Sequence, residues 1–180
     1  MPVEQLRRVV LASLMAALMA VGAYIHVPVG PVPIVLTNLF VLLSGLLIGS
    51  RWGLVSVGLY LLIGAIGMPV FYGGKGGIAH ILGPTGGYLF GFALSAWGTG
   101  FISQRFRHHV VGEGIAVIFG VLAVYGVGVP WLKLVTGMSW EKAWLVGMLP
   151  FLVGDAVKAF VAVVLARAVR PMLKRQATQE

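Results

Sequence analysis

The sequence predicts an all-α membrane protein, a compact bundle of six transmembrane helices with a re-entrant or structured glycine-rich loop on its outer face. Of the 180 residues, 59% are hydrophobic and only 10% are charged, whereas a soluble domain carries about 25% charged residues. Apolar runs of roughly 20 residues, the length that crosses a bilayer, recur along the chain. Lysine and arginine gather at the ends of these runs, in agreement with the positive-inside rule.

Six spans fit within one integral membrane domain of residues 1–180: 8–25, 34–50, 51–70, 85–103, 110–129 and 150–169. Only "GSRWG" separates the second from the third, which predicts a tight turn. The first connection, "HVPVGPVPI", carries three prolines that prevent helix formation, so we expect an extended or re-entrant segment there. Arg7 and Arg8 also resemble the basic start of a signal peptide, but the length of the run that follows favours a retained span.

The fifth connection has structure of its own. Ser139 is suited to cap a short helix, and Glu141 falls in the first turn, where a negative charge interacts favourably with the helix dipole. Pro150 suits the first turn of the last span, because a helix makes no use of that N–H group. The alternative is a single kinked helix from Ser139 onward.

The distribution of basic residues predicts the orientation in the membrane. Nine lie at one end of the predicted bundle and three at the other; the nine are Arg7, Arg8, Arg51, Arg105, Arg107, Arg167, Arg170, Lys174 and Arg175, and the three are Lys75, Lys133 and Lys142. Because basic loops stay inside, both termini are expected in the cytoplasm. The expected location is the cytoplasmic (inner) membrane of a bacterium or an archaeon.

Composition also argues against several function classes. The formal charge of +8 does not indicate nucleic-acid binding, because the basic residues sit at the ends of apolar segments. The absence of cysteine excludes disulfides and thiolate metal sites. His26 and His80 have no third ligand near them in sequence, so we expect neither a metal nor a cofactor. There is no Walker motif and no evident acid–base pair, so neither ATP hydrolysis nor another enzymatic activity is expected.

Asp155 and Lys158, in "GDAVK" of the last span, are the leading candidates for a binding site. They are three residues apart and therefore share a helix face. Each charge costs about 2.5–3.5 kcal/mol at mid-membrane, so such residues face the protein interior or a wet cavity. A lysine attracts a carboxylate, while an ionised aspartate accepts N–H or O–H donors. The alternative is a structural ion pair that only neutralises itself.

Two further polar residues lie near the predicted outer ends of spans. Asn38, just after the proline segment, has an amide that both donates and accepts hydrogen bonds. Tyr88, at the start of the fourth span, can form a pocket wall and offer a hydroxyl. The alternatives are a contact between helices for Asn38 and an ordinary interfacial tyrosine for Tyr88.

The stretch "GGKGGIAHILGPTGGYLFGF" is the most unusual in the chain, with eight glycines and one proline in residues 73–92. Irregular backbone at membrane depth is tolerated only where it is buried in protein or lines a cavity, and glycine permits positive φ and close backbone approach. We therefore predict a floor or lid over a ligand, with part of the site formed by Gly73, Gly74, Lys75, Gly76 and Gly77. The alternative is a plain external turn.

Small residues recur every four positions in the first span, at Ala12, Ala16 and Ala20. This spacing gives a smooth stripe that lets helices approach closely in lipid. We interpret the stripe as a docking face for another membrane protein, the alternative being packing within the bundle.

Four stretches together resemble the BioY family, the substrate-binding membrane subunits (S components) of energy-coupling factor (ECF) transporters for biotin. They are "GPVPIVLTNLFVLLSGLLIGSRWG", "YLLIGAIGMPVFYGGKGGIAHILGPTGGYLFGF", "AVYGVGVPWL" and "GMSWEKAWLVGMLPFLVGDAVKA". With the alanine stripe they cover most of the chain in family order, and the combination of "GGKGG", "GPTGGY" and "GDAVK" is highly specific.

The resemblance implies capture of biotin from outside with high affinity, by a six-helix subunit without its own ATPase. It implies docking, through Ala12, Ala16 and Ala20, to a transmembrane coupling protein (T component) and through it to two ABC ATPases. Asp155 would meet the ureido ring, and Lys158 would meet the carboxylate or orient the aspartate, with Lys75 as the rival for the carboxylate. The alternatives are an S component for another small vitamin and a stand-alone secondary transporter.

Overall fold

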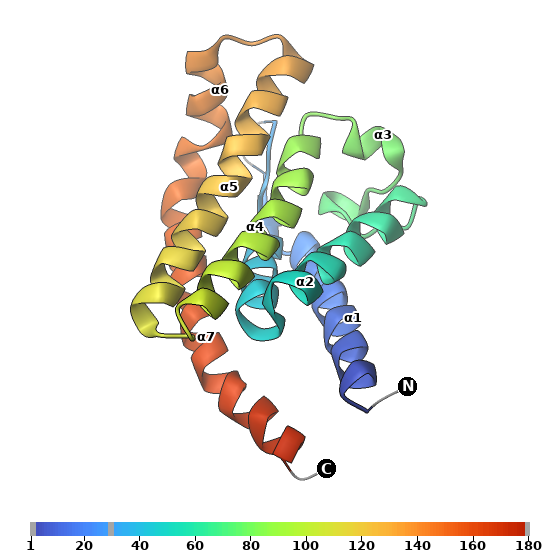
Figure 1. The fold of residues 1–180 in the computed structure, drawn as a ribbon. Helices are drawn as coiled ribbons and strands as arrows, with labels where there is room; N and C mark the ends of the chain where they lie inside the picture. The colour runs from blue at the N-terminus through green and yellow to red at the C-terminus, as the bar shows by residue number, and fades with distance from the viewer. Residues whose placement is uncertain (1–2, 29–30, 179–180) are drawn as a thin grey trace.

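The computed structural model describes residues 3–28 and 31–178, and it is a helical bundle (Figure 1). Five long helices form the bundle: α1 (Val3–Tyr24), α2 (Thr37–Ala65), α4 (Gly86–Arg105), α5 (Val110–Thr136) and α7 (Leu152–Thr178). Two short helices, α3 (Ile78–Ile81) and α6 (Trp140–Gly147), and two 3₁₀ turns, η1 (Tyr72–Gly74) and η2 (Leu149–Phe151), lie in the connections.

Within the described residues, four helical stretches are long and apolar enough to cross a membrane: Val3–Tyr24, Thr37–Ala65, Val110–Thr136 and Trp140–Leu173. The predicted class, an all-α multi-pass membrane protein, is confirmed. Several helices begin and end away from the predicted limits. The first begins at Val3 rather than residue 8, the fifth continues to Thr136 rather than 129, and the last continues to Thr178 rather than 169.

The predicted spans 34–50 and 51–70 are the two arms of α2, which breaks at Gly49 (φ 81°, ψ −179°). Figure 1 shows the first arm descending and the second rising from the break. Because both arms share 29 residues, each is shorter than the roughly 20 residues of a full crossing. The second arm ends at Ala65 rather than residue 70, since Gly67 (φ 100°) follows at once. The backbone conformation of Gly49 thus makes the turn between the two arms, where two separate spans would need a loop.

Glycine also brings α2 and α4 into close contact. A Cβ atom at Gly45 would lie 2.6 Å from the Ala96 carbonyl oxygen, and one at Gly53 would lie 3.2 Å from the Cα of Gly45. The first contact leaves no room for a Cβ atom, and the second brings the two arms of α2 close together. Helices in lipid commonly associate through such small residues, so this crossing fixes the centre of the bundle.

Several connections between helices lie together at one end of the bundle. The proline segment is extended as predicted: β1 (His26–Val27) pairs antiparallel with β2 (Ile34–Val35). The hairpin, α3 and α6 lie at the end opposite the start of α1 and the end of α7 (Figure 1). Ser139 caps α6 by accepting from the Lys142 N–H at 3.3 Å. Met148 (φ −134°) interrupts the helical stretch that runs from Trp140 to Leu173, so the short capped helix is joined to the last span through a kink.

An ion-pair network ties α5 and α7 together at the other end. The Glu113 side chain is 0% exposed, and its carboxylate accepts from Arg170 at 2.5 Å and from Arg167 at 3.4 Å. Arg170 also donates to the Leu46 carbonyl oxygen in α2 at 2.9 Å. Arg170 therefore links the buried carboxylate of α5 to the backbone of α2.

Glu113→Gln should destabilise the bundle by about 3–5 kcal/mol, because removing one partner leaves the arginines facing each other without the compensating charge. An SDS titration followed by circular dichroism measures this free energy of unfolding. The matched control is Glu4→Gln, which breaks the exposed pair with Arg8 and should cost at most about 1 kcal/mol. Equal effects of the two changes would show that the buried network does not stabilise the fold.

Candidate functional site

A cavity opens between the hairpin, both arms of α2, α4, α5 and α7 at the loop-bearing end of the bundle. It encloses about 630 Å³ of space free of protein atoms, including its open mouth. Most of its wall is aliphatic or aromatic: Ala23, Val32, Pro33, Val35, Tyr60, Phe71, Tyr72, Tyr88, Leu89, Phe92, Val124, Tyr125 and Phe151. The cavity therefore suits a ligand with an apolar body.

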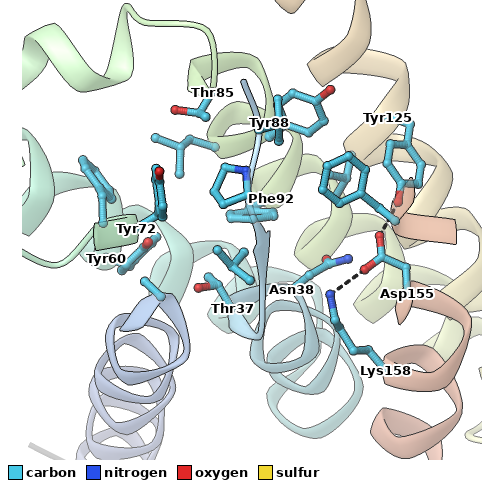
Figure 2. Close-up of a pocket in the computed structure, with 18 of the residues that line it drawn as sticks. Thr37, Asn38, Tyr60, Tyr72, Thr85, Tyr88, Phe92, Tyr125, Asp155 and Lys158 are labelled. Atoms are coloured by element: carbon cyan, nitrogen blue, oxygen red, sulfur yellow. Dashed lines mark hydrogen bonds and ion pairs between the residues drawn. The ribbon is translucent and has the colours of Figure 1, made fainter. Parts of the chain in front are cut away.

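One end of the cavity holds a buried carboxylate with two donors. Asp155 is 5% exposed, and its Oδ1 accepts from Lys158 Nζ at 2.8 Å. Its Oδ2 accepts from the Tyr125 hydroxyl, and Figure 2 shows both contacts as dashed lines. Lys158 lies on the same helix, whereas Tyr125 reaches across from α5. A carboxylate has about four lone-pair positions, so Asp155 retains capacity for a further donor.

Asn38 stands beside this pair with an unused acceptor. It is 4% exposed and lines the cavity, and its Oδ1 is buried with no hydrogen-bond partner among the described residues. Figure 2 shows Asn38 on the same side of the cavity as Asp155 and Lys158. An unsatisfied buried acceptor costs about 1–3 kcal/mol, so a ligand N–H at this position would be strongly favoured.

The opposite wall comes from the second arm of α2 and from the chain between α2 and α4. Tyr60 and Tyr72 lie on this side (Figure 2), with Phe71 completely buried against Tyr60 at 5.4 Å between ring centroids. The His80 ring stacks on the Phe71 ring, with 5.2 Å between the ring centroids. Burial lowers the pKa of His80 and the charge of Lys75 lowers it further, so the imidazole is neutral at pH 7.

Tyr88 lines the cavity, but its hydroxyl donates to the Gly147 carbonyl oxygen at 2.8 Å. The contact ties α4 to the end of α6. Tyr88 therefore presents mainly its ring to the cavity, and its oxygen can serve a ligand only as an acceptor.

Comparison with known proteins agrees with this architecture. The family model described as "BioY family" matches residues 1–175. The chain belongs to the BioY family. It is 42% identical over 160 residues to the "Probable biotin transporter BioY" of Pyrococcus horikoshii, covering 89% of this chain and 94% of that protein. It is 39% identical over 163 residues to the "Biotin transporter BioY" of Thermotoga maritima, covering 89% and 94%.

A solved structure shares the fold. It is described as the "Crystal structure at 2.1 A of the S-component for biotin from an ECF-type ABC transporter". The TM-score is 0.88 at 32% identity, over 95% of this chain and 94% of that one. The resemblance noted from the sequence motifs is therefore confirmed, as is the fold class. No group of three or more metal-ligating His, Asp or Glu side chains occurs in the part of this BioY-family chain that is described.

The structure brings together Asn38, Tyr88, Asp155 and Lys158 but places the glycine loop differently from our prediction. None of Gly73, Gly74, Lys75, Gly76 and Gly77 is among the residues that line the cavity; the loop contributes its neighbours Phe71, Tyr72 and His80. A Cβ at Gly76 would overlap the Met68 carbonyl oxygen, and Gly73, Gly74 and Gly77 have positive φ. The glycines shape the loop that holds the aromatic wall.

Lys75 lies at the rim of this wall. Its Nζ is 5.0 Å from the centroid of the Tyr72 ring, a cation–π distance, and Tyr72 itself lines the cavity. Among the described residues, Lys75 makes no salt bridge. The cavity thus has a charged network at one end and a lysine beside its opposite, aromatic wall.

The alanine stripe does not lie on an open face. Ala12 and Ala16 are 2% and 4% exposed, and Ala20 is half-buried against the core. The exposed face of α1 instead carries larger side chains, including Val10, Leu14 and Val21. The small residues allow α1 to approach α2 closely, as the packing alternative required. The role of these three positions in docking a partner stays a prediction.

Sequence reasoning missed several cavity residues, of which Tyr125 and Phe71 are the most consequential. Both lie inside the stretches "AVYGVGVPWL" and "GMPVFYGGKGG" that carry the family resemblance. Single aromatic residues in a membrane helix or loop give no signal of their own, because core packing and interfacial anchoring use the same residue types.

A notch at Gly64 holds the loop in place, because a Cβ there would overlap the Phe71 ring. Gly64→Ala should therefore dislodge Phe71 and expose the loop. Trypsin should then cleave after Lys75 about tenfold faster than in the wild type, because local opening of the loop would cost about 1.4 kcal/mol less. Cleavage is followed in detergent by mass spectrometry of the fragment that begins at Gly76. The control is Gly58→Ala in the same helix, where a Cβ meets nothing within 4 Å. Equal cleavage rates in the two variants would show that the notch does not secure the loop.

Proposed function

We propose that this chain captures biotin from outside the cell and delivers it for ATP-driven uptake as the S component of an ECF transporter. The observation that carries the proposal is the Tyr125–Asp155–Lys158 network beside the unsatisfied Asn38, at one end of an aromatic cavity. The names of its relatives, biotin transporters at 42% and 39% identity, point to the same substrate.

The chemistry of biotin matches the cavity group by group. Its ureido ring carries two N–H donors, which suit the carboxylate of Asp155 and the free Oδ1 of Asn38. Its fused rings and alkyl chain are apolar and suit the aromatic wall. Lys158 is engaged with Asp155 at 2.8 Å, so its role is to balance the charge of that carboxylate and to orient it. Lys75, beside Tyr72, is then the cation that receives the biotin carboxylate.

Transport requires partners. The sequence has no Walker motif, so ATP hydrolysis falls to two ABC ATPases, coupled through a transmembrane T component. The structural neighbour is described as part of an ECF-type ABC transporter, which supports this assembly. We place the chain in the cytoplasmic membrane with both termini inside, following the nine-to-three bias of basic residues.

Asp155→Asn and Lys158→Ala should each weaken biotin binding by roughly 10- to 100-fold, since a hydrogen bond to a charged group contributes about 1.5–3 kcal/mol. The measurement is a titration of purified protein in detergent with labelled biotin, alongside a panel of other small vitamins. Glu4→Gln, a charge change remote from the cavity, serves as the control. Undiminished affinity in both site variants would remove the pair from the site, and tight binding of another vitamin alone would replace the substrate.

Lys75→Ala should weaken binding of biotin by about tenfold, a typical loss for one partly exposed charge pair, and leave binding of biotin methyl ester unchanged. The ester keeps the ring and chain but lacks the anionic carboxylate. Lys142→Ala, another lysine at the same end of the bundle, is the control. If Lys158→Ala rather than Lys75→Ala discriminates between biotin and its ester, then Lys158 receives the carboxylate.

A further inference from the structure

A second cavity lies at the opposite end of the bundle from the ligand cavity. It encloses about 920 Å³ of space free of protein atoms, including its mouth. The start of α1, the break in α2, the end of α4 and the last turns of α7 supply its walls. We propose that this cavity binds the phosphate of an anionic phospholipid headgroup.

The charge of the wall favours an anion. Three arginines, Arg7, Arg8 and Arg170, line the cavity with a single carboxylate, that of Glu4. Glu4 is shared between Arg8 at 3.0 Å and Arg7 at 3.9 Å. Glu113, which does not line the cavity, is shared between Arg170 and Arg167 in the same way. Three guanidinium groups and one carboxylate line the cavity, so its wall carries an excess of two positive charges.

Unused donors accompany this charge. Arg170 uses its terminal nitrogens on Glu113 and the Leu46 carbonyl, and its buried Nε has no partner among the described residues. Gln104 accepts from the Ser50 hydroxyl at 3.2 Å through Oε1, so its amide NH₂ is the end that is left to donate. Both side chains line the cavity. Guanidinium and amide N–H groups are the donors that phosphate oxygens accept.

The loop between α4 and α5 adopts strained backbone to complete this wall. Arg107 (φ 49°) and His108 (φ 59°) are the described non-glycine residues with positive φ, a conformation that costs energy at each. His108 lines the cavity, and its Nδ1 is 2.9 Å from the Ser103 hydroxyl. Such strain persists where the surrounding structure holds a side chain in a particular position.

The apolar part of the wall distinguishes a lipid from free phosphate. Leu11, Leu47, Ile48 and Leu173 line the same cavity as the arginines. A phospholipid presents a phosphate directly beside its glycerol and acyl chains, and it can therefore satisfy both surfaces. Basic pockets between transmembrane helices on the cytoplasmic side are typical sites for anionic headgroups, and this end of the bundle carries most of the basic residues.

Native mass spectrometry of the delipidated protein tests the proposal by comparing phosphatidylglycerol with phosphatidylcholine. The wild type should retain phosphatidylglycerol preferentially. Millimolar inorganic phosphate should displace it only weakly, because phosphate lacks the apolar part. Equal retention of both lipids would overturn the proposal, and so would full displacement by inorganic phosphate. This lipid comparison uses only the wild-type protein, so it is decisive even if a substitution impairs folding.

The matched variants are two double changes that remove equal charge at the same end of the molecule. Arg7→Gln with Arg8→Gln should weaken phosphatidylglycerol binding by about tenfold. Arg51→Gln with Arg105→Gln, residues that do not line the cavity, should leave it within about twofold of the wild type. Circular dichroism establishes that both variants remain helical. Equal losses would show attraction to general surface charge and not a site.

Discussion

A single ionised side chain organises the ligand end of the molecule. Asp155 lies almost fully buried in an apolar cavity, where an isolated carboxylate would be strongly disfavoured. It is tolerated because Lys158 neutralises it from one helical turn away and Tyr125 donates from the neighbouring helix. The contact with Tyr125 fixes the spacing of α5 and α7, and the remaining lone pairs of Asp155 point to a ligand with donors. The charge balance, the helix packing and the ligand binding at this end therefore all depend on the Asp155 carboxylate.

The loop that closes the cavity depends on the absence of side chains. Gly64 admits the Phe71 ring, and Gly87, at the start of α4, admits Trp131 of α5. The indole N–H of Trp131 then donates to the Gly83 carbonyl oxygen at 3.0 Å, which satisfies backbone that would otherwise be exposed in a membrane. Tyr24 secures the other side of the loop by donating to the Pro69 carbonyl oxygen at 2.5 Å. A glycine-rich stretch is therefore compatible with a well-defined wall around a binding site.

Charged residues in apolar helices are strong signals, and the sequence located Asp155, Lys158 and Asn38 because each is costly to bury without a purpose. The extended proline segment, the cap at Ser139 and the class of the fold were predictable for the same kind of local reason. The arms of α2 were not, because a break such as the one at Gly49 depends on the fit of Gly45 and Gly53 against neighbouring backbone. The sequence could not decide the role of the alanine stripe, since the same pattern serves contacts within a bundle and between proteins.

The two buried carboxylates have a joint consequence for motion. Asp155 and the Glu113 partner Arg170 are 15 positions apart on α7, about 22 Å along the helix axis. Glu113 lies near the start of α5 and Tyr125 near its middle, so the two helices are fastened to each other at two levels. Separating them would break a desolvated charge contact at one level or the other, which is costly. The proline hairpin and the glycine loop contact each other through the His26–Tyr72 ring pair at 5.0 Å, and the neutral hydrogen bond from Tyr24 to the Pro69 carbonyl oxygen holds the loop to α1. Opening for a ligand therefore costs least at these loops, while α5 and α7 move as one body.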